Sequence, residues 1–369
     1  MHDIGGSKRA AQAYSLDDIA IYGTRRTRGI ESVDLSWKID ALDFDFPLIA
    51  APMDSVMSPK LAIEFGRLGG LGVINLEGLW TRYADPQPIL DELAEIEDQL
   101  SATKRMQEVY AEPIKAELIV ERMREIREAG VPVAGSLSPR NAREFSEAVQ
   151  SSGADFFVIR GTAVSAEHVS EGVEPLDLRR FIYDLDVPVI VGGCASYKTA
   201  LHLMRTGAAG VLVGFGGSAA SANAQVLGIQ IPMATAIAQV AEARRDYLDE
   251  SGGRYVHVIA DGSMGHSGDV VKAFACGADA AMIGSPLARA FEAPGQGWHW
   301  GQEAWHEALP RGRRVHFDQI GTLSEIVMGP SHIPDGTMNI VGALRRALAS
   351  TGYTDVKSFQ RIDVIVHSL

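Results

Sequence analysis

The sequence predicts a (β/α)₈ barrel, formed as a single domain by residues 1–369. Short apolar runs alternate with helical stretches, and we count eight such runs. Each run is continuously hydrophobic rather than alternating, which is typical of a parallel strand buried on both faces. The chain, with 46% hydrophobic residues, is long enough to bury a core of that size.

The predicted strands are residues 47–53, 70–75, 131–137, 154–161, 187–193, 210–216, 256–262 and 279–285. Crossover helices are predicted between them. The helix at residues 58–69 begins with a Ser-Pro pair, and those at residues 200–207 and 266–277 end at a glycine. Eight strand–helix units in this order favour a barrel.

Two segments are additional to the strands and helices of a minimal barrel. Residues 76–130 are polar and charge-rich, and we expect two or three helices outside the barrel, broken at Pro113. Residues 287–337 contain many Gly, Trp and His residues and follow the eighth strand. An insertion on that face is expected to form a flap over an active site or a contact in an oligomer.

Composition narrows the classes of partner. A formal net charge of −13 disfavours nucleic acid as a ligand. No apolar run approaches the length of a membrane span, and the N-terminal residues contain no apolar core of the signal-peptide kind. We therefore expect a cytoplasmic protein without membrane contact. Two cysteines provide neither a disulfide framework nor a metal-ligand cluster.

Three Gly/Ser loops follow predicted strands. The first, within residues 211–232, contains Gly214, Gly216 and Gly217 and then Ser218 and Ser221. The others are residues 259–269 and 282–286. Glycine allows close backbone approach, and free N–H groups can bind an anion, so the loops predict one phosphate site built from several places. An ordinary glycine turn is the alternative for the first loop.

A dinucleotide-binding open sheet is the alternative fold. Residues 214–219 fit the pattern G-x-G-x-x-A. That fingerprint also requires an acidic residue at the end of the next strand, about 20 residues further on. The next predicted strand ends in Asp261, far beyond this spacing, so the barrel is preferred.

Several of these segments, in the same order along the chain, resemble the IMP dehydrogenase and GMP reductase family. They are residues 51–56 (APMDSV), 69–74 (GGLGVI), 189–193 (VIVGG), 207–210 (GAAG), 259–262 (IADG), 282–285 (MIGS) and 342–345 (GALR). The chain resembles a short member in which residues 76–130 stand in place of the regulatory CBS domains. This resemblance implies that regulation through such domains is absent.

The resemblance implies a purine nucleoside 5′-monophosphate as substrate. Asp261 would hold the ribose hydroxyls, and the phosphate would lie on backbone and hydroxyl donors. Phe317 stands where the family usually has a phosphate-binding tyrosine. The full set of implied substrate-binding residues is Ala51, Met53, Ser218, Asp261, Gly262, Ser263, Gly284, Ser285, Ile320 and Gly321.

The catalytic position departs from the family pattern. Ser221 aligns with the family's cysteine nucleophile, and a serine hydroxyl needs a strong adjacent base before it can attack. Cys194, at the end of the fifth predicted strand, is the alternative source of a thiol, although its position favours a buried structural cysteine. Cys276 lies in a predicted helix and is expected to be structural.

The resemblance also implies a cofactor, NAD or NADP, near Arg160, Gly161 and Thr162. Arg160 replaces an acidic residue of the family and could meet an extra phosphate, a substrate carboxylate, or a partner inside the barrel. A potassium ion is implied near Gly214 and Gly216. Relatives form tetramers, and we expect a homotetramer in which the tryptophans of the last insertion, Trp298, Trp300 and Trp305, offer contact surface.

Two hypotheses about function follow. The first is an oxidoreductase that converts IMP to XMP with NAD, or GMP to IMP with NADPH. The second is a nucleotide-binding paralogue that has lost this chemistry, as the serine at position 221 suggests.

Overall fold

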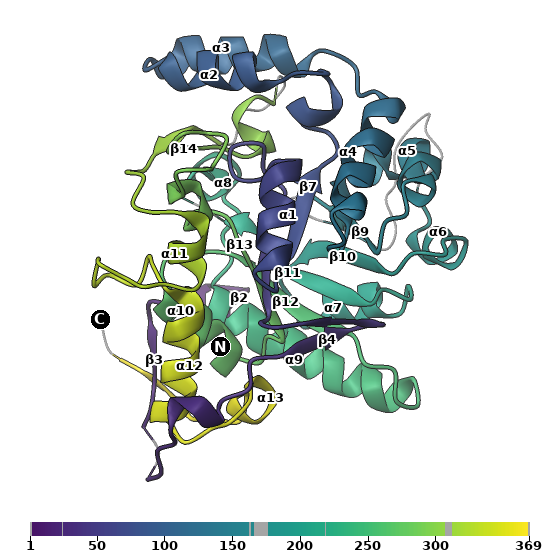
Figure 1. The fold of residues 1–369 in the computed structure, drawn as a ribbon. Coiled ribbons are helices and arrows are strands. Elements are labelled where there is room, and N and C mark those ends of the chain that lie inside the picture. The colour runs from purple at the N-terminus through teal and green to yellow at the C-terminus, as the bar shows by residue number, and fades with distance from the viewer. Residues whose placement is uncertain are drawn as a thin grey trace.

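The computed structural model describes residues 2–23, 25–161, 164–165, 176–217, 219–306 and 312–367 (Figure 1). Eight parallel strands form a closed barrel, in which neighbours along the chain are also neighbours in space. The predicted fold class is confirmed. The strands are β6 (Leu48–Ala50), β7 (Leu71–Asn75), β8 (Ala134–Leu137), β9 (Phe156–Arg160), β10 (Val189–Cys194), β11 (Gly210–Gly217), β12 (His257–Gly262) and β13 (Ala280–Ile283).

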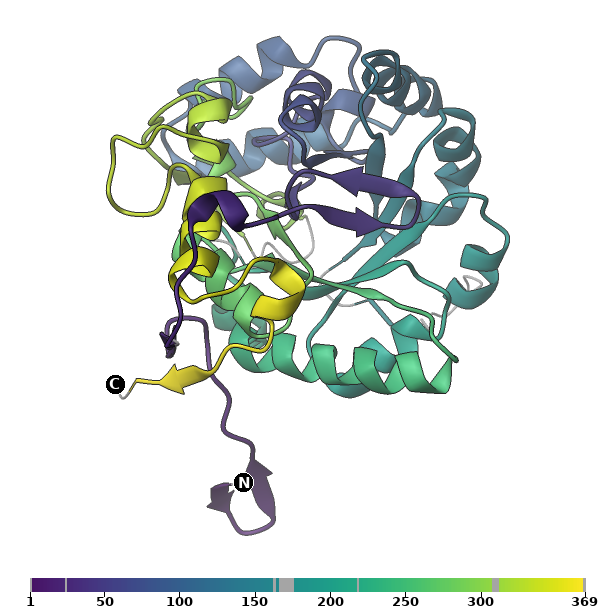
Figure 2. The ribbon, with the colours of Figure 1, turned by 60° about the horizontal axis from the view of Figure 1, so that its bottom comes forward.

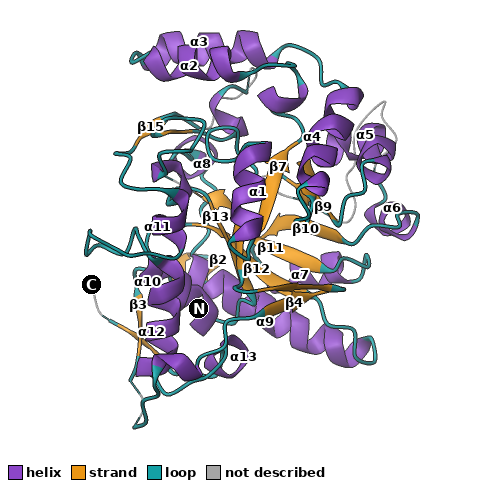
Figure 3. Ribbon diagram, viewed as in Figure 1, coloured by secondary structure: helices purple, strands orange, loops and turns teal. Residues whose placement is uncertain are grey.

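All eight strands lie within or beside the predicted apolar runs, and β8, β10 and β13 are buried along their whole length. Helices surround them (Figure 3). The outer helices are α1 (Pro59–Arg67), α4 (Ala116–Glu128), α5 (Pro139–Ser151), α6 (Leu178–Tyr183), α7 (Tyr197–Met204), α9 (Met233–Glu250), α10 (Ser267–Ala275) and α12 (Ile340–Ser350). Three shorter helices are α8 (Asn223–Leu227), α11 (Leu323–Val327) and α13 (Val356–Phe359).

Local signals explain where several helices begin and end. The hydroxyl of Ser58 accepts a hydrogen bond from the backbone N–H of Leu61, and Pro59 occupies the first helical position of α1. Gly207 and Gly277 follow α7 and α10 with φ of +100° and +113°, a conformation that favours glycine. These turns lead directly into β11 and β13.

The helical segment at residues 76–130 divides into two parts. After η2 (Leu79–Thr81), α2 (Gln87–Glu95) and α3 (Gln99–Tyr110) lie side by side beyond the barrel, at the top of Figure 1. The chain turns around Pro113 and continues as α4, which packs between α1 and α5 in the outer ring. Of the α-helices in residues 76–130, α2 and α3 therefore lie outside the barrel's own ring, and α4 belongs to it.

The segment after β13 packs on α2 and α3 rather than standing free. It contains η3 (Leu287–Arg289), β14 (Trp298–His299), η4 (Gln302–Ala304) and β15 (Val315–His316). Its apolar residues join those of α2 and α3 in a second hydrophobic core, separate from that of the barrel. The buried members are Leu79, Leu90, Leu93, Met106, Val109, Tyr110, Trp300 and Ala304, with Trp298 and Trp305 packed against them.

This second core corrects one sequence-based expectation. Trp300 is 1% exposed, and Trp298 and Trp305 are partly buried against the same chain. The indole N–H of Trp298 donates to the carbonyl of Ala94 at 2.9 Å. Packing within the chain therefore removes Trp300, and part of the surfaces of Trp298 and Trp305, from the contact surface that we expected for an oligomer.

The opposite end of the barrel carries elements that the sequence analysis did not predict. A hairpin of β4 (Trp37–Ile39) and β5 (Leu42–Phe44) crosses that end (Figure 2), and Trp37 donates to Nδ1 of His257 at the start of β12. A hairpin of β1 (His2–Gly5) and β2 (Lys8–Ala10) projects from the body. Strand β3 (Ile19–Ile21) pairs with β16 (Val364–Val366), close to the C-terminal end of the chain. A short 3₁₀ helix, η1 (Ile30–Ser32), lies between β3 and β4.

Among the described helices, none combines the length and hydropathy that crossing a membrane requires.

Candidate functional site

Two adjoining pockets lie at the carboxyl ends of the barrel strands. The first, here the glycine–serine pocket, is lined by Ala51, Met53, Arg160, Gly216, Asp261, Gly262, Ser263, Met264, Met282, Ile283, Gly284 and Ser285. The second, here the polar cleft, lies beneath the segment after β13. Met53, Arg160 and Gly216 line both pockets, so the two adjoin at these three residues.

The glycine–serine pocket combines the loops that follow β12, β13 and β6. Gly262 and Ser263 have positive φ values of +90° and +59°, which turn the chain sharply at the end of β12. A Cβ atom at Gly284 would lie 3.2 Å from Sδ of Met53, so the backbone there forms a close wall. Backbone N–H groups and hydroxyls at such turns can bind an anion.

The pocket gathers seven of the ten predicted substrate-binding residues: Ala51, Met53, Asp261, Gly262, Ser263, Gly284 and Ser285. Ser218 lies outside the described residues. Ile320 and Gly321 line neither pocket, and both are hydrogen-bonded to the chain at the end of η3 and just after it. The N–H of Ile320 donates to the carbonyl of Arg289 at 2.9 Å, and the carbonyl of Gly321 accepts from Phe291 at 2.8 Å.

Asp261 is already engaged. Its carboxylate accepts two hydrogen bonds from Arg160, Nε to Oδ2 at 2.8 Å and Nη2 to Oδ1 at 3.3 Å. The side chain of Asp261 is 3% exposed and that of Arg160 is 23% exposed. Burial lowers the pKa of Arg160, but the charge and hydrogen bonds of Asp261, with the charge of Glu303, outweigh it and raise that pKa. Of the three partners considered for Arg160, the structure shows the one inside the barrel.

Gly216 makes room for this ion pair. A Cβ atom at position 216 would overlap Nη2 of Arg160, and φ there is +65°. Gly214, at φ +112°, would place a Cβ on the carbonyl oxygen of Asp261. The carbonyl oxygen of Gly214 itself lies against Gly193 in the neighbouring strand. The guanidinium beside Gly216 would place a positive charge next to the predicted potassium ion, and the potassium site stays a prediction from the resemblance.

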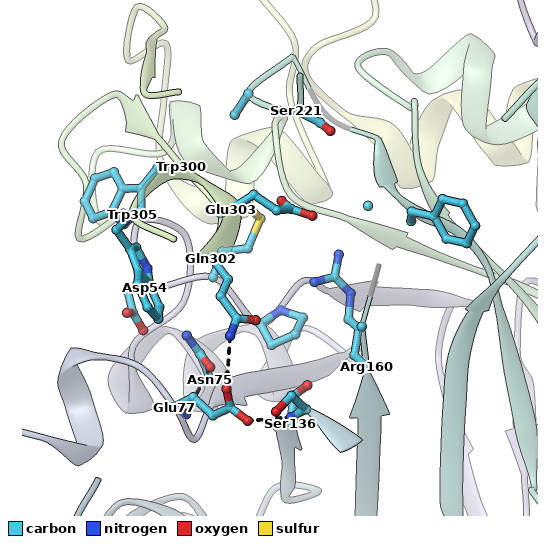
Figure 4. A pocket seen from close by; sticks show the side chains of 18 of the residues that line it. Asp54, Asn75, Glu77, Ser136, Arg160, Ser221, Trp300, Gln302, Glu303 and Trp305 are labelled. Atoms are coloured by element: carbon cyan, nitrogen blue, oxygen red, sulfur yellow. Dashed lines mark hydrogen bonds between the residues drawn. The ribbon is translucent and has the colours of Figure 1, made fainter. Parts of the chain in front are cut away.

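The polar cleft contains carboxylates, amides, hydroxyls and indoles (Figure 4). Glu77, after β7, accepts from Nε2 of Gln302 at 3.1 Å and from the backbone N–H of Ser138 at 2.5 Å. Gln302 thus connects the segment after β13 to the barrel rim. The remaining lining residues are Pro52, Met53, Asp54, Asn75, Tyr110, Ser136, Leu137, Arg160, Gly161, Phe215, Gly216, Ala220, Ser221, Trp300, Gly301, Glu303 and Trp305.

Asp54 is a buried carboxyl group at the edge of this cleft. Its Oδ2 accepts from the hydroxyl of Tyr110 at 2.6 Å and from the N–H of Leu79 at 3.0 Å. Oδ1 has no hydrogen-bond partner among the described residues. Burial raises the pKa of Asp54 to about 6, against the lowering effect of these hydrogen bonds.

Tyr110 joins Asp54 to the covering segment. Its oxygen accepts from Nε1 of Trp300 at 3.1 Å, and its ring stacks on Trp305 with centroids 4.5 Å apart. No motif in the sequence points to Tyr110 as a site residue. It lies in α3, far along the chain from Asp54, and no local pattern indicates that the two meet.

The candidate nucleophiles differ in exposure. Ser221 is half-buried and lines the polar cleft, and its Oγ accepts the backbone N–H of Asn223 at 3.4 Å. Cys194 is 1% exposed, and its thiol donates to the carbonyl of Leu212 at 3.3 Å. Burial raises the pKa of Cys194 to about 12, so its thiol stays protonated. Cys194 lines neither pocket, which favours its interpretation as a structural residue.

Two further residues concern the cofactor. Gly161, like Arg160, lines the polar cleft. Thr162 lies outside the described residues. Two of the three residues predicted to bind a nicotinamide cofactor, Arg160 and Gly161, therefore line the polar cleft.

Comparisons with known proteins agree with this arrangement. A family model described as the IMP dehydrogenase / GMP reductase domain matches residues 13–306. A protein of Mycolicibacterium smegmatis, named an uncharacterized oxidoreductase, is 48% identical and aligns over 100% of both chains. An inosine-5′-monophosphate dehydrogenase of Methanocaldococcus jannaschii is 24% identical over 78% of this chain and 74% of its own.

A solved structure is similar over nearly the whole chain. It is the crystal structure of an IMP dehydrogenase/GMP reductase-like protein from Corynebacterium glutamicum, with a TM-score of 0.95 and 50% sequence identity. The similarity covers 99% of this chain and 97% of that one. Nothing of the size of an additional domain therefore separates the two chains.

Proposed function

The chain belongs to the IMP dehydrogenase/GMP reductase family, and on that premise we propose that it binds a purine nucleoside 5′-monophosphate and exchanges hydride between this nucleotide and NAD or NADP. The observation that carries the proposal is that two pockets adjoin and share three lining residues. One is built from glycine and serine loops suited to a phosphate, and the other is a larger polar cleft. Two ligands could meet where Met53, Arg160 and Gly216 line both.

For the nucleotide, we assign the phosphate to Gly262, Ser263, Gly284 and Ser285, because their loops converge on one pocket. The ribose would lie beside the Arg160–Asp261 pair. A hydroxyl can donate to a carboxylate and accept from a guanidinium, so a diol can bind to the intact pair or replace one of its hydrogen bonds. Ala51 and Met53 would form the wall opposite. Ser218, Ile320 and Gly321 remain predictions from the resemblance.

For the cofactor, we assign the nicotinamide end of NAD or NADP to the polar cleft near Arg160 and Gly161. When bound, it would accept or supply the hydride. The indole of Trp305 and the amide of Gln302 offer a flat apolar face and a hydrogen-bonding group for a heteroaromatic amide. Potassium at Gly214 and Gly216 receives no support from the packing around these glycines.

A second function, a nucleotide-binding paralogue without the family's reaction, is favoured by the state of the nucleophiles. Ser221 lines the polar cleft but carries a hydroxyl where the family has a thiol. Cys194 has a thiol, but it is buried and its pKa is raised. The fold and the phosphate pocket would serve binding in either case. We propose a cytoplasmic homotetramer for both functions.

Titration calorimetry with IMP and with GMP tests nucleotide binding. Ser285→Asp should abolish it, because a carboxylate beside a phosphate in a partly desolvated pocket is strongly repelled. Ser146→Asp, at a partly exposed position of α5 away from both pockets, is the matched control and should bind as the native protein does. Equal affinity in native protein and Ser285→Asp would place the nucleotide elsewhere.

An absorbance assay separates the two functions. Native protein and Ser221→Cys are incubated with IMP plus NAD and with GMP plus NADPH, with and without potassium. Turnover by the native protein at roughly 1 per second or more supports the oxidoreductase. Nucleotide binding without turnover, and a gain in Ser221→Cys, supports the paralogue.

A further inference from the structure

His299 is a buried imidazole behind the glycine–serine pocket. It lies in β14, is 0% exposed, and packs against Phe317 with ring centroids 5.8 Å apart. Burial lowers the pKa of His299 to about 4, so the ring is neutral at physiological pH. No residue of the predicted site accounts for a buried histidine at this position.

The ring meets the pocket through Ser285. Nε2 lies 3.4 Å from Oγ of Ser285, within hydrogen-bonding range, and Cε1 lies 3.4 Å from the position that a Cβ atom would take at Gly284. Ser285 and Gly284 both line the pocket. His299 therefore supports the wall of the pocket and touches its hydroxyl from behind.

The other ring nitrogen indicates which tautomer is present. Nδ1 is buried and has no hydrogen-bond partner among the described residues. A neutral imidazole has one N–H, and a buried N–H without an acceptor is rarer than a buried acceptor without a donor. The proton therefore belongs on Nε2, from which it is donated to Oγ of Ser285.

We propose that His299 is a positioning residue of the phosphate pocket: its Nε2–H occupies an acceptor site of Ser285, which leaves the serine hydroxyl to donate into the pocket. With the opposite tautomer, or an acceptor in place of His299, the Ser285 proton would point backward and its lone pairs would face the anion. This inference rests on the proposed binding of a nucleoside monophosphate and identifies what makes the pocket selective for an anionic group.

Phe317 packs beside His299 without offering a polar group. Its ring lies beside the imidazole and carries no hydroxyl, and the guanidinium of Arg289 lies over that ring, 4.6 Å from its centroid. The aromatic ring thus contributes no hydrogen-bond donor on this side of the pocket. The pair of Ser285 and His299 supplies one.

The test is a double-mutant cycle on ligand binding. GMP and guanosine are titrated into native protein, His299→Phe, Ser285→Ala and the double variant. His299→Phe keeps a ring but removes its nitrogens. We expect about a tenfold loss of GMP affinity in each single variant, the size of one hydrogen bond to a charged group. We expect no further loss in the double variant and no change for guanosine, which lacks the phosphate.

Two more variants separate positioning from packing. His299→Gln retains an N–H donor and should recover part of the lost affinity. His316→Phe changes an exposed imidazole of the adjacent strand β15 and should bind as the native protein does. The melting temperature of His299→Phe should be unchanged or higher, since a buried nitrogen without a partner is removed.

Additive losses, an equal loss for guanosine, or native affinity in His299→Phe would overturn the role of His299 while leaving nucleotide binding intact. If the native protein binds neither GMP nor IMP, the proposed function itself fails, and the role of His299 with it.

Discussion

At the scale of single residues, the ion pair of Arg160 and Asp261 is the main difference between the site expected from the sequence and the site in the structure. The carboxylate of Asp261, which we assign to the ribose, also accepts two hydrogen bonds from Arg160. A buried pair becomes costly when one partner is removed, because an isolated charge is left in a poorly solvated place. The pair is therefore a structural element of the pocket as well as a candidate contact with the ligand.

Replacing Arg160 by Met should lower the free energy of unfolding by about 3 kcal/mol, since Asp261 is left buried and charged. Urea denaturation of Arg160→Met measures this loss. The double variant Arg160→Met with Asp261→Asn should recover most of it, because no charge remains unpaired. A single variant as stable as the native protein would mean that the pair contributes nothing to the fold.

Asp54 gives a prediction about pH. Its pKa in the folded protein is about 6, above the ordinary 3.8, so folding favours the protonated acid. Its contribution to stability is fully present below about pH 3.8 and is lost as pH rises through 6. At pH 7 the loss is about 3 kcal/mol.

Asp54→Asn should therefore raise the melting temperature at pH 8 and raise it much less at pH 4.5, since the amide cannot ionise. Thermal unfolding at several pH values measures the difference. Asp318→Asn changes an exposed carboxylate and should leave the pH profile unaltered. An equal gain for Asp54→Asn at both pH values would contradict the buried, partly protonated acid.

The sequence revealed those site residues that follow strands and lie in Gly/Ser loops. Gly262, Ser263, Gly284 and Ser285 meet in one pocket because the carboxyl ends of parallel strands lie at the same end of a barrel. It did not reveal His299 or Tyr110, or the partner that Arg160 selects. These contacts join segments far apart in the chain, and a hydrogen bond between distant residues leaves no periodic signal in either segment.

At the scale of elements, α2, α3 and the segment after β13 form one covering layer with its own core. Arg314 connects the two parts of this layer. Its side chain is almost wholly buried, and its guanidinium donates to the carbonyls of Leu93 and Ile96 at the end of α2. The guanidinium also lies 4.1 Å from the ring centroid of Trp298. The barrel strands were predictable from continuous hydrophobic runs. The covering layer was not predictable in this way, because its core combines residues from two segments whose sequences are polar or irregular.

Arg314→Met should loosen this layer without unfolding the barrel. We expect faster hydrogen exchange in residues 87–110 and 298–305, with unchanged exchange in the barrel strands, since the layer's core is separate. Hydrogen exchange followed by mass spectrometry resolves the segments. The neighbouring exposed Arg313→Met is the control. Uniformly faster exchange would show that the layer and the barrel unfold as one unit.

At the scale of the whole molecule, the N-terminal hairpin is the feature that a single chain leaves unexplained. Strand β1 is exposed along its full length, β2 nearly so, and Ile4 is 64% exposed. An isolated two-stranded hairpin is marginally stable in water. We therefore expect it to pack on a second copy of the chain.

Light scattering at micromolar concentration should give the mass of a homotetramer for the full chain. Removal of residues 2–10 should shift it to a smaller species while the far-ultraviolet circular dichroism stays that of a folded barrel. A monomer mass for the full chain would reject the tetramer, and an unchanged tetramer in the shortened chain would reject the hairpin's part in it.

The most direct test of the proposed nucleotide site is a crystal structure of the protein soaked with IMP and NAD. The account predicts the 5′-phosphate of IMP on the loops of Gly262, Ser263, Gly284 and Ser285, with the hydroxyl of Ser285 donating to it and the ribose beside Asp261. A nucleotide bound with its phosphate outside these loops, or a glycine–serine pocket left empty while IMP binds elsewhere, would contradict it.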